Sequence, residues 1–133
     1  MDKIYEELIY CALEARKNAY CPYSNFAVGS AVLTKSGKIY TGCNIENASY
    51  PNGICAERTA ISKAISEGET ALVAVAIAST SEKMAYPCGM CRQFINEFAS
   101  DELKIYLVNN ENKVILEPFN ILFPHGFSRK DLN

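Results

Sequence analysis

Leu72-Val-Ala-Val-Ala-Ile-Ala78 is an uninterrupted apolar run near the middle of this 133-residue chain. A strand that is covered on both faces has this composition, whereas a strand with one face in water alternates apolar and polar residues. A helix is expected from about residue 88 to 98 and a further strand at 104–108, so the two strands should be parallel and joined by a right-handed crossover. The run therefore predicts an α/β sheet with helices packed on its faces.

The flanking segments extend this alternation of helices and strands. Apolar residues recur at helical spacing in residues 2–18, which predicts a first helix. We also expect a hairpin of strands at 26–34 and 38–42, a helix from 55 to 67 that Gly68 ends, an antiparallel strand at 113–116, and a short helix with Pro118 in its first turn. The prediction is one domain, residues 1–133, with a five-stranded mixed sheet in a three-layer α/β/α fold.

The charge balance argues against a polynucleotide partner. The chain has 13 basic and 15 acidic residues and a formal net charge of −2. Nucleic-acid-binding proteins usually carry a basic patch, and no basic run is present here. No apolar stretch approaches the length of a membrane span, and the acidic segment 1–7 does not resemble a signal peptide. We therefore expect a small uncharged ligand, no membrane partner, and a cytoplasmic location in which thiols stay reduced.

Two short motifs carry the chemistry. The first is Cys55-Ala-Glu57-Arg58, and the second is Pro87-Cys88-Gly-Met-Cys91-Arg92. Together they offer three thiols and a carboxylate, and catalytic zinc needs three protein ligands with a fourth position left for water. Both motifs fall at predicted helix starts, where the positive end of the helix dipole favours thiolates. The pattern predicts a zinc site at Cys55, Cys88 and Cys91, with Glu57 as the group that moves protons.

The spacing within the first motif sets a condition on this prediction. Residues two apart on a regular helix point to opposite sides, so Cys55 and Glu57 meet at one metal only if Cys55 lies at or before the first helical residue. Three thiolates around Zn²⁺ also leave a net negative charge. Arg58 is expected to offset that charge by donating hydrogen bonds to the sulfurs.

Other roles for these cysteines remain open at this point. Cys88 and Cys91 also fit a redox pair next to a βαβ unit, or half of a structural zinc site with Cys43 as the nearest fourth ligand. Three disulfides among the six cysteines would require a secreted chain. Cys11, Cys21 and Cys43 carry no motif, so structural roles are expected for them.

The motifs together resemble the zinc-dependent nucleoside and nucleobase deaminases, a signature described for that class. With cysteine as the first ligand, the chain is similar to the small homotetrameric cytidine deaminases. The resemblance covers nearly the whole chain and includes Phe26-Ala-Val-Gly-Ser-Ala, Gly42-Cys-Asn-Ile-Glu-Asn-Ala-Ser49, Cys55-Ala-Glu-Arg-Thr-Ala60, Pro87-Cys-Gly-Met-Cys-Arg-Gln93 and Leu122-Phe-Pro-His-Gly-Phe127.

This resemblance implies a hydrolase that deaminates cytidine and deoxycytidine to uridine and deoxyuridine with release of ammonia, in pyrimidine salvage. It implies one zinc per subunit, which activates water for attack on C4 of the ring. Glu57 would take the proton of that water, deliver one to N3, and later protonate the departing amine.

The resemblance also assigns the substrate contacts. Asn44 and Glu46 would bind the ribose hydroxyls, and the backbone around Ala56 would contact the edge of the base. Phe26 would pack on the pyrimidine face, and Phe127 would do so from a neighbouring subunit. The implied assembly is a homotetramer whose active sites are completed by neighbouring subunits.

Three rival functions are set against this one. Deaminases of blasticidin S share the zinc motif but lack the Asn-x-Glu that Asn44 and Glu46 supply. Polynucleotide deaminases place a helix after the fourth strand, where this chain has only about four polar residues at 109–112. A non-enzymatic zinc module would use four protein ligands and would leave Glu57 without a role.

Overall fold

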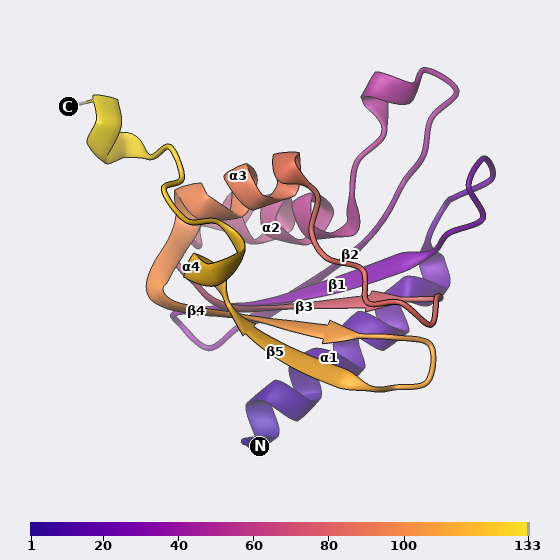
Figure 1. Ribbon diagram of the computed structural model, residues 1–133, viewed down its shortest axis with the longest axis horizontal. Helices are drawn as coiled ribbons and strands as arrows, with labels where there is room; N and C mark the ends of the chain where they lie inside the picture. The colour runs from indigo at the N-terminus through magenta and orange to yellow at the C-terminus, as the bar shows by residue number, and fades with distance from the viewer. Residues whose placement is uncertain (133) are drawn as a thin grey trace.

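The computed structural model describes residues 1–132, so Asn133, the last residue of the predicted domain, lies outside the described residues. Five strands form one sheet in the order β2-β1-β3-β4-β5 (Figure 1). The strands are β1 (Val28–Thr34), β2 (Ile39–Cys43), β3 (Leu72–Ser79), β4 (Ala99–Val108) and β5 (Val114–Pro118). The pair β3 and β4 is parallel and the other neighbouring pairs are antiparallel, which confirms the predicted mixed sheet.

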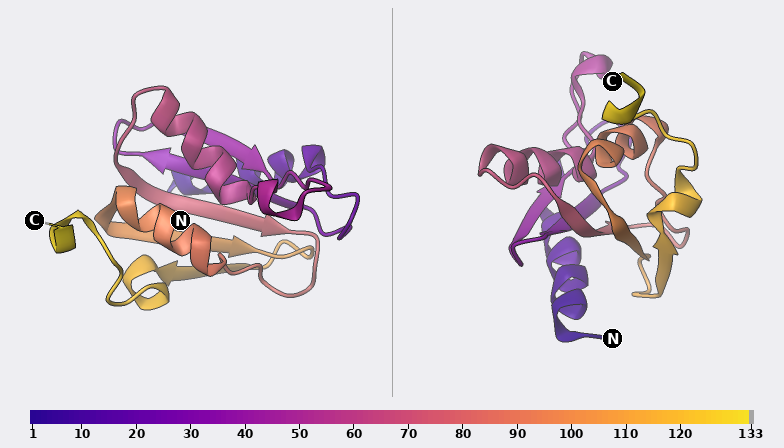
Figure 2. Two further views of the ribbon diagram at one scale, coloured as in Figure 1. Left: turned by 90° about the horizontal axis from the view of Figure 1, so that it is seen from above. Right: turned by 90° about the vertical axis from the view of Figure 1, so that its left-hand side faces the viewer.

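Helices cover both faces of this sheet. The helix α1 (Lys3–Ala15), continued by a 3-10 turn at Arg16–Asn18, packs on one face, and α2 (Ala56–Ser66) and α3 (Gly89–Phe98) pack on the other (Figure 2). The short helix α4 (Phe119–Leu122) follows β5, and 3-10 turns occur at Tyr50–Asn52 and Arg129–Leu132. The predicted three-layer arrangement is confirmed.

Strand β3 shows why its apolar run does not alternate. Ala74, Ala76 and Ala78 belong to the core beneath α1, whereas Val75 and Ile77 belong to the core beneath α2 and α3. Both faces of the strand are therefore buried, as the composition of the run predicts. The small alanine side chains leave room for α1 to lie close to the sheet.

Most boundaries shift by one to three residues from the sequence-based expectation, and three of the differences have a clear structural reason. Strand β4 begins at Ala99 and not at 104, because Ala99 pairs with Leu72 ahead of a register shift and α3 runs directly into the strand. Strand β1 begins at Val28 and not at 26, because the Phe26 carbonyl and the Val28 N–H are hydrogen-bonded to the Asn44 side chain and not to a neighbouring strand. Pro118 is the last residue of β5 and caps α4 with extended backbone, so it is not within the first turn of that helix.

Gly42 fixes the position of α2 on the sheet. A Cβ atom at Gly42 would lie 2.5 Å from the Ala60 nitrogen and 2.7 Å from the Ala56 oxygen. Helix and strand backbones thus meet at a separation that only glycine permits. This contact holds the first turn of α2, which carries the Cys55-Ala-Glu57 motif, against β2.

Within residues 1–132, none of the helices has the combination of length and apolar character that crossing a bilayer requires.

Candidate active site

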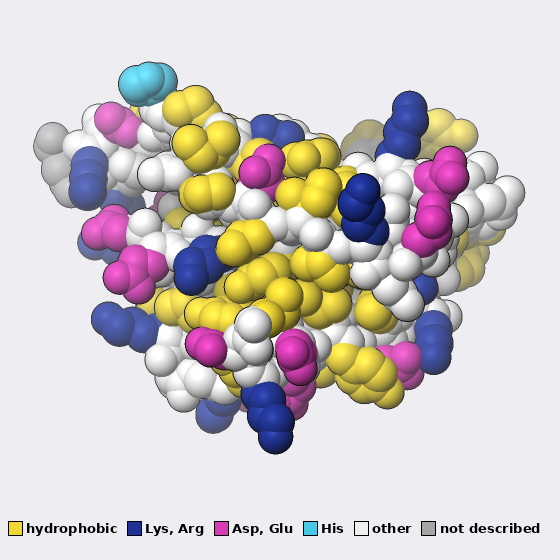
Figure 3. Space-filling model, turned by 60° about the horizontal axis from the view of Figure 1, so that its bottom comes forward, with side chains coloured by type: hydrophobic (Ala, Val, Ile, Leu, Met, Phe, Trp, Pro, Cys, Tyr) yellow, Lys and Arg dark blue, Asp and Glu magenta, His cyan; other side chains and the backbone are white. Residues whose placement is uncertain are grey.

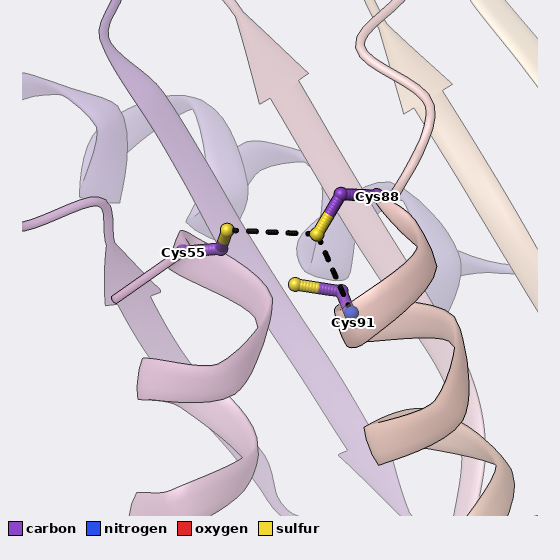
Figure 4. Close-up of side chains that lie close together, drawn as sticks. All are labelled: Cys55, Cys88 and Cys91. Atoms are coloured by element: carbon purple, nitrogen blue, oxygen red, sulfur yellow. Dashed lines mark hydrogen bonds between the residues drawn. The ribbon is translucent and has the colours of Figure 1, made fainter. Parts of the chain in front are cut away.

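Three cysteine sulfurs converge between the first turns of α2 and α3 (Figure 4). The sulfurs of Cys55, Cys88 and Cys91 all lie within 4.8 Å of one another, and those of Cys55 and Cys88 are 3.9 Å apart. Tetrahedral zinc with Zn–S bonds of about 2.3 Å separates its sulfur ligands by about 3.8 Å. The cluster therefore has the donor type and the spacing that a zinc ion requires.

Helix starts position these sulfurs. Cys55 is the N-cap of α2 with φ −74° and ψ 156°, and Cys88 is the N-cap of α3 with φ −67° and ψ 168°. Cys91 lies in the first turn of α3, and its N–H donates to the Cys88 sulfur at 3.4 Å. The extended backbone of Cys55 meets the condition that the sequence sets, because this residue precedes the helix.

The three thiols differ in how readily they ionise. A hydrogen bond from the Cys91 thiol, helped by Arg58, lowers the pKa of Cys55 to about 5. The same hydrogen bond holds the proton on Cys91, and its pKa is raised. Because thiolates are the metal-binding form of cysteine, the site offers an ionised sulfur before an ion arrives.

Cys43, considered above as a fourth ligand, is not part of this cluster. It ends β2 and is a free thiol, as are all six cysteines, which lie in the described part of the chain. The geometry thus groups three sulfurs, which leaves one tetrahedral position open, the arrangement typical of catalytic zinc.

Glu57 is buried beside the sulfurs and faces a cleft. Its exposed fraction is 4%, and burial raises its pKa to about 7, with the charge of Cys55 acting in the same direction. The cleft measures about 260 Å³ and is lined by Ser24, Phe26, Val28, Asn44, Glu46, Cys55, Ala56, Glu57, Ile77, Ala85, Tyr86 and Cys88. A carboxyl that titrates near neutral pH is suited both to accept and to donate a proton.

Arg58 interacts with two of the sulfurs. Desolvation lowers the pKa of Arg58, but the hydrogen bonds and charges of Cys55 and Cys91 outweigh this effect and raise it. Its Nε atom is buried without a hydrogen-bond partner among the described residues. By contrast, the Arg92 guanidinium donates to the carbonyls of Pro87 and Leu122 at 2.7 Å and ties α3 to the C-terminal segment.

Four of the five residues expected to contact substrate lie in this cleft, namely Phe26, Asn44, Glu46 and Ala56. Phe127 does not line it. The Phe127 side chain is 55% exposed, and its carbonyl accepts hydrogen bonds from Gln93 and Asn96 at 2.9 Å. The structure therefore places Phe127 on an outer surface of the chain.

Asn44 and Glu46 make contacts that the sequence does not predict. The Asn44 side chain accepts from the Val28 N–H at 2.9 Å and donates to the Phe26 carbonyl at 2.8 Å. The Glu46 carboxylate accepts from the backbone N–H groups of Tyr23 and Ser24 at 2.9 and 3.1 Å. Both side chains thus hold the segment that carries Phe26, and each keeps hydrogen-bonding capacity for a ligand.

Sequence reasoning missed two polar side chains of the cleft, Ser24 and Tyr86. Tyr86 directly precedes Pro87-Cys88, so its position next to a predicted metal-binding motif could have indicated that it lies in the cleft. Ser24 lies in a turn-forming stretch with no motif of its own. Its hydrogen-bond partner Glu46 is 22 residues away, which local sequence does not indicate.

Comparison with known proteins gives a consistent result. The model of the family described as "cytidine and deoxycytidylate deaminase zinc-binding region" matches residues 2–120. Cytidine deaminase of Sporosarcina psychrophila is 44% identical over 128 residues, which cover 96% of this chain and 94% of that protein. Cytidine deaminase of Halalkalibacterium halodurans is also 44% identical, over 95% of this chain and 96% of that protein.

Solved structures agree with the fold. The crystal structure of cytidine deaminase from Burkholderia pseudomallei superimposes with a TM-score of 0.87 at 40% identity, covering 96% of this chain and all of that one. Cytidine deaminase from Mycobacterium tuberculosis gives a TM-score of 0.81 at 36% identity, covering 95% of this chain and 98% of that one. These similarities confirm the predicted fold, and the zinc-binding family together with the sulfur cluster confirms zinc as the expected cofactor.

Proposed function

Since the chain belongs to the cytidine and deoxycytidylate deaminase zinc-binding family, we propose that it hydrolyses cytidine and deoxycytidine to uridine and deoxyuridine, releasing ammonia. The observation that carries this proposal is the buried Glu57 carboxyl, which lines a cleft together with Cys55 and Cys88. An acid held beside a three-sulfur metal site is the arrangement that hydrolytic deamination of a cytosine ring requires.

Cys55, Cys88 and Cys91 would hold one zinc ion in each subunit. When bound there, zinc supplies the Lewis acidity that makes water a nucleophile at neutral pH. Arg58 would offset the negative charge of the sulfurs, a role supported by the raised pKa that Cys55 and Cys91 give it. Arg58 thereby stabilises the ligand set without touching the substrate.

Glu57 would carry the protons of the reaction. It accepts the proton of the attacking water and donates one to N3 of the ring, which makes C4 more electrophilic. It then takes the remaining proton from the hydroxyl added at C4 and delivers it to the amine, so that the C4–N bond breaks as the C4 carbonyl forms and ammonia leaves. Its burial supports these roles, because a pKa of about 7 lets one carboxyl act as base and then as acid.

The remaining cleft residues would bind and orient the nucleoside. Phe26 packs on the pyrimidine face, Asn44 and Glu46 bind the sugar hydroxyls, and the backbone around Ala56 contacts the edge of the base. Support comes from their shared position in the cleft and from the free acceptor and donor sites on the two polar side chains.

The charge of the cleft favours a nucleoside over a nucleotide. The twelve residues that line it include two carboxylates, Glu46 and Glu57, and no lysine or arginine. A phosphate group would meet negative charge there with no cation to pair with. On the face in Figure 3, basic and acidic side chains are interspersed around an apolar area, which also argues against a nucleic-acid partner.

We infer further that residues 1–133 act as a single domain and that four copies assemble, with Phe127 entering the site of a neighbouring subunit. The exposed Phe127 ring, which is absent from the cleft of its own chain, supports this assignment. We propose a role in pyrimidine salvage and a cytoplasmic location, where the sulfur ligands stay reduced.

The test is an ultraviolet assay. Zinc-loaded protein is mixed with cytidine, and the absorbance change that accompanies conversion to uridine is followed with and without a chelator. We expect turnover that the chelator abolishes and added zinc restores. No spectral change with fully zinc-loaded protein would rule out the proposed function. A parallel assay with deoxycytidylate is expected to show little turnover.

A further inference from the structure

The segment that carries Phe26 is held in place by the residues that follow β2. The Tyr20 N–H donates to the Asn44 carbonyl at 3.0 Å, the Glu46 N–H donates to the Tyr20 carbonyl at 2.8 Å, and the Asn44 N–H donates to the Val28 carbonyl at 3.1 Å. The two loops lie side by side at one end of the sheet (Figure 1). Phe26 therefore owes its position to contacts with residues 44–46.

The hydroxyl of Ser24 is the centre of this contact. It donates to Oε2 of Glu46 at 2.5 Å and accepts from the Phe26 N–H at 3.1 Å. The Ser24 side chain thus connects the Glu46 carboxylate to the backbone of Phe26. Asn25, between the two, has a φ of 56°, a left-handed conformation that bends the chain around the hydroxyl.

These contacts leave Glu46 with a defined free acceptor site. Oε1 accepts two backbone N–H groups, and Oε2 accepts the Ser24 hydroxyl. An ionised carboxylate has about four acceptor positions, so one position on Oε2 remains. This position can accept a hydrogen bond from a hydroxyl group of a ligand. Because Ser24 occupies the other position on Oε2, it determines the direction from which a ligand can donate to the Glu46 carboxylate.

We propose that Ser24 is a positioning residue that aims Glu46 at a sugar hydroxyl of the substrate and, through the same hydroxyl group, holds Phe26 against the base. This inference rests on the proposed function. The two proposed substrates differ at the 2′-hydroxyl and share the 3′-hydroxyl, so we assign the 3′-hydroxyl to Glu46. Ser24 is then a determinant of specificity for nucleosides with a 3′-hydroxyl, although Ser24 itself needs no contact with the reacting atoms.

The test compares three variants of the zinc-loaded protein with cytidine and with 3′-deoxycytidine. Ser24→Ala removes the hydroxyl, and Ser24→Thr keeps it. Ser36→Ala is the matched control, because Ser36 also donates from an exposed position to a glutamate, Glu69 at 2.9 Å, but in the turn at the other end of β1.

We expect Ser24→Ala to raise KM for cytidine about tenfold and to change kcat less than about twofold. A tenfold weaker binding corresponds to the loss of one charge-assisted hydrogen bond. The preference for cytidine over 3′-deoxycytidine, measured as a ratio of kcat/KM values, should fall by about the same factor. Ser24→Thr should restore both values, and Ser36→Ala should leave them unchanged.

Two outcomes would overturn the proposal. One is an unchanged preference in Ser24→Ala, which includes an equal loss of kcat/KM for both nucleosides, and the other is no recovery in Ser24→Thr. Because Ser24 is exposed, the alanine variant should fold, and its thermal transition is checked against the control. If the wild-type protein turns over cytidine and Ser24→Ala behaves as wild type, the inference fails and the proposed function stands. A wild-type protein without activity rejects both.

Discussion

Cys55 and Glu57 are two residues apart in the chain, and both side chains line the same cleft. The extended backbone of Cys55 makes this possible, since Cys55 lies outside α2 and Glu57 lies within its first turn. On a continuous helix, two such residues would diverge by about half a turn. The end of the helix thus brings the proposed metal ligand and the proposed proton carrier together.

Replacing the Glu57 carboxyl by an amide should remove turnover and keep the metal. We expect Glu57→Gln to lower kcat at least about 100-fold, because positioned acid–base groups contribute about 10²–10⁴ to rates. Steady-state kinetics and metal analysis check this. Glu67→Gln, an exposed residue at the other end of α2, is the control and should keep wild-type activity. Near-normal activity in Glu57→Gln would contradict the assigned role.

The zinc content of single cysteine variants should divide the cysteines into two groups. Cys88→Ser is expected to bind much less zinc, because it removes one of three sulfurs that lie within 4.8 Å of one another. Cys43→Ser should keep about one zinc per chain, since Cys43 is outside the cluster. Metal analysis after dialysis distinguishes the two. Loss of zinc in Cys43→Ser would favour a structural four-ligand site.

Much of this site is predictable from the sequence, because its key residues are adjacent along the chain and begin helices. Cys55, Cys88 and Cys91 fall at helix starts, which local patterns predict well. The early start of β4 is different, because Ser100, Asp101 and Glu102 form no apolar pattern and lie in the irregularity between Ala99, which pairs with Leu72, and Lys104, which pairs with Ala74. Ser24 could not be found either, since its role depends on a loop far along the chain.

Gly42 should be intolerant of any side chain. We expect Gly42→Ala to lower the free energy of unfolding by about 1–3 kcal/mol, because the added Cβ would overlap the backbone of α2 at Ala56 and Ala60. Chemical denaturation measures the effect. Gly89→Ala is the control, since nothing lies within 4 Å of its Cβ position, and it should be neutral or slightly stabilising. Equal free energies of unfolding for the two variants would show that α2 moves to accommodate the added Cβ atom without loss of stability.

The titration of Glu46 should report its bond to Ser24. The Ser24 hydroxyl, with backbone N–H groups of residues 23 and 24, lowers the pKa of Glu46. A lowered folded-state pKa means that these contacts stabilise the fold above the ordinary carboxyl pKa, and that this contribution is lost as the pH falls through the lowered value. We expect NMR titration to show a higher pKa for Glu46 in Ser24→Ala than in the wild type. An identical pKa in the two proteins would show that the hydroxyl does not bind the carboxylate in solution.

Mixing two defective variants tests whether Phe127 acts in a neighbouring subunit. Glu57→Gln lacks the carboxyl that is proposed to carry protons, and Phe127→Ala lacks the exposed ring that its own cleft does not contain. If each site combines Glu57 of one chain with Phe127 of another, random assembly of equal amounts restores about a quarter of the sites. We expect the mixture, unfolded and refolded together, to exceed the summed activities of the two variants refolded separately. Activity equal to that sum would mean that Phe127 serves the site of its own chain or none, because no mixed site would then be complete.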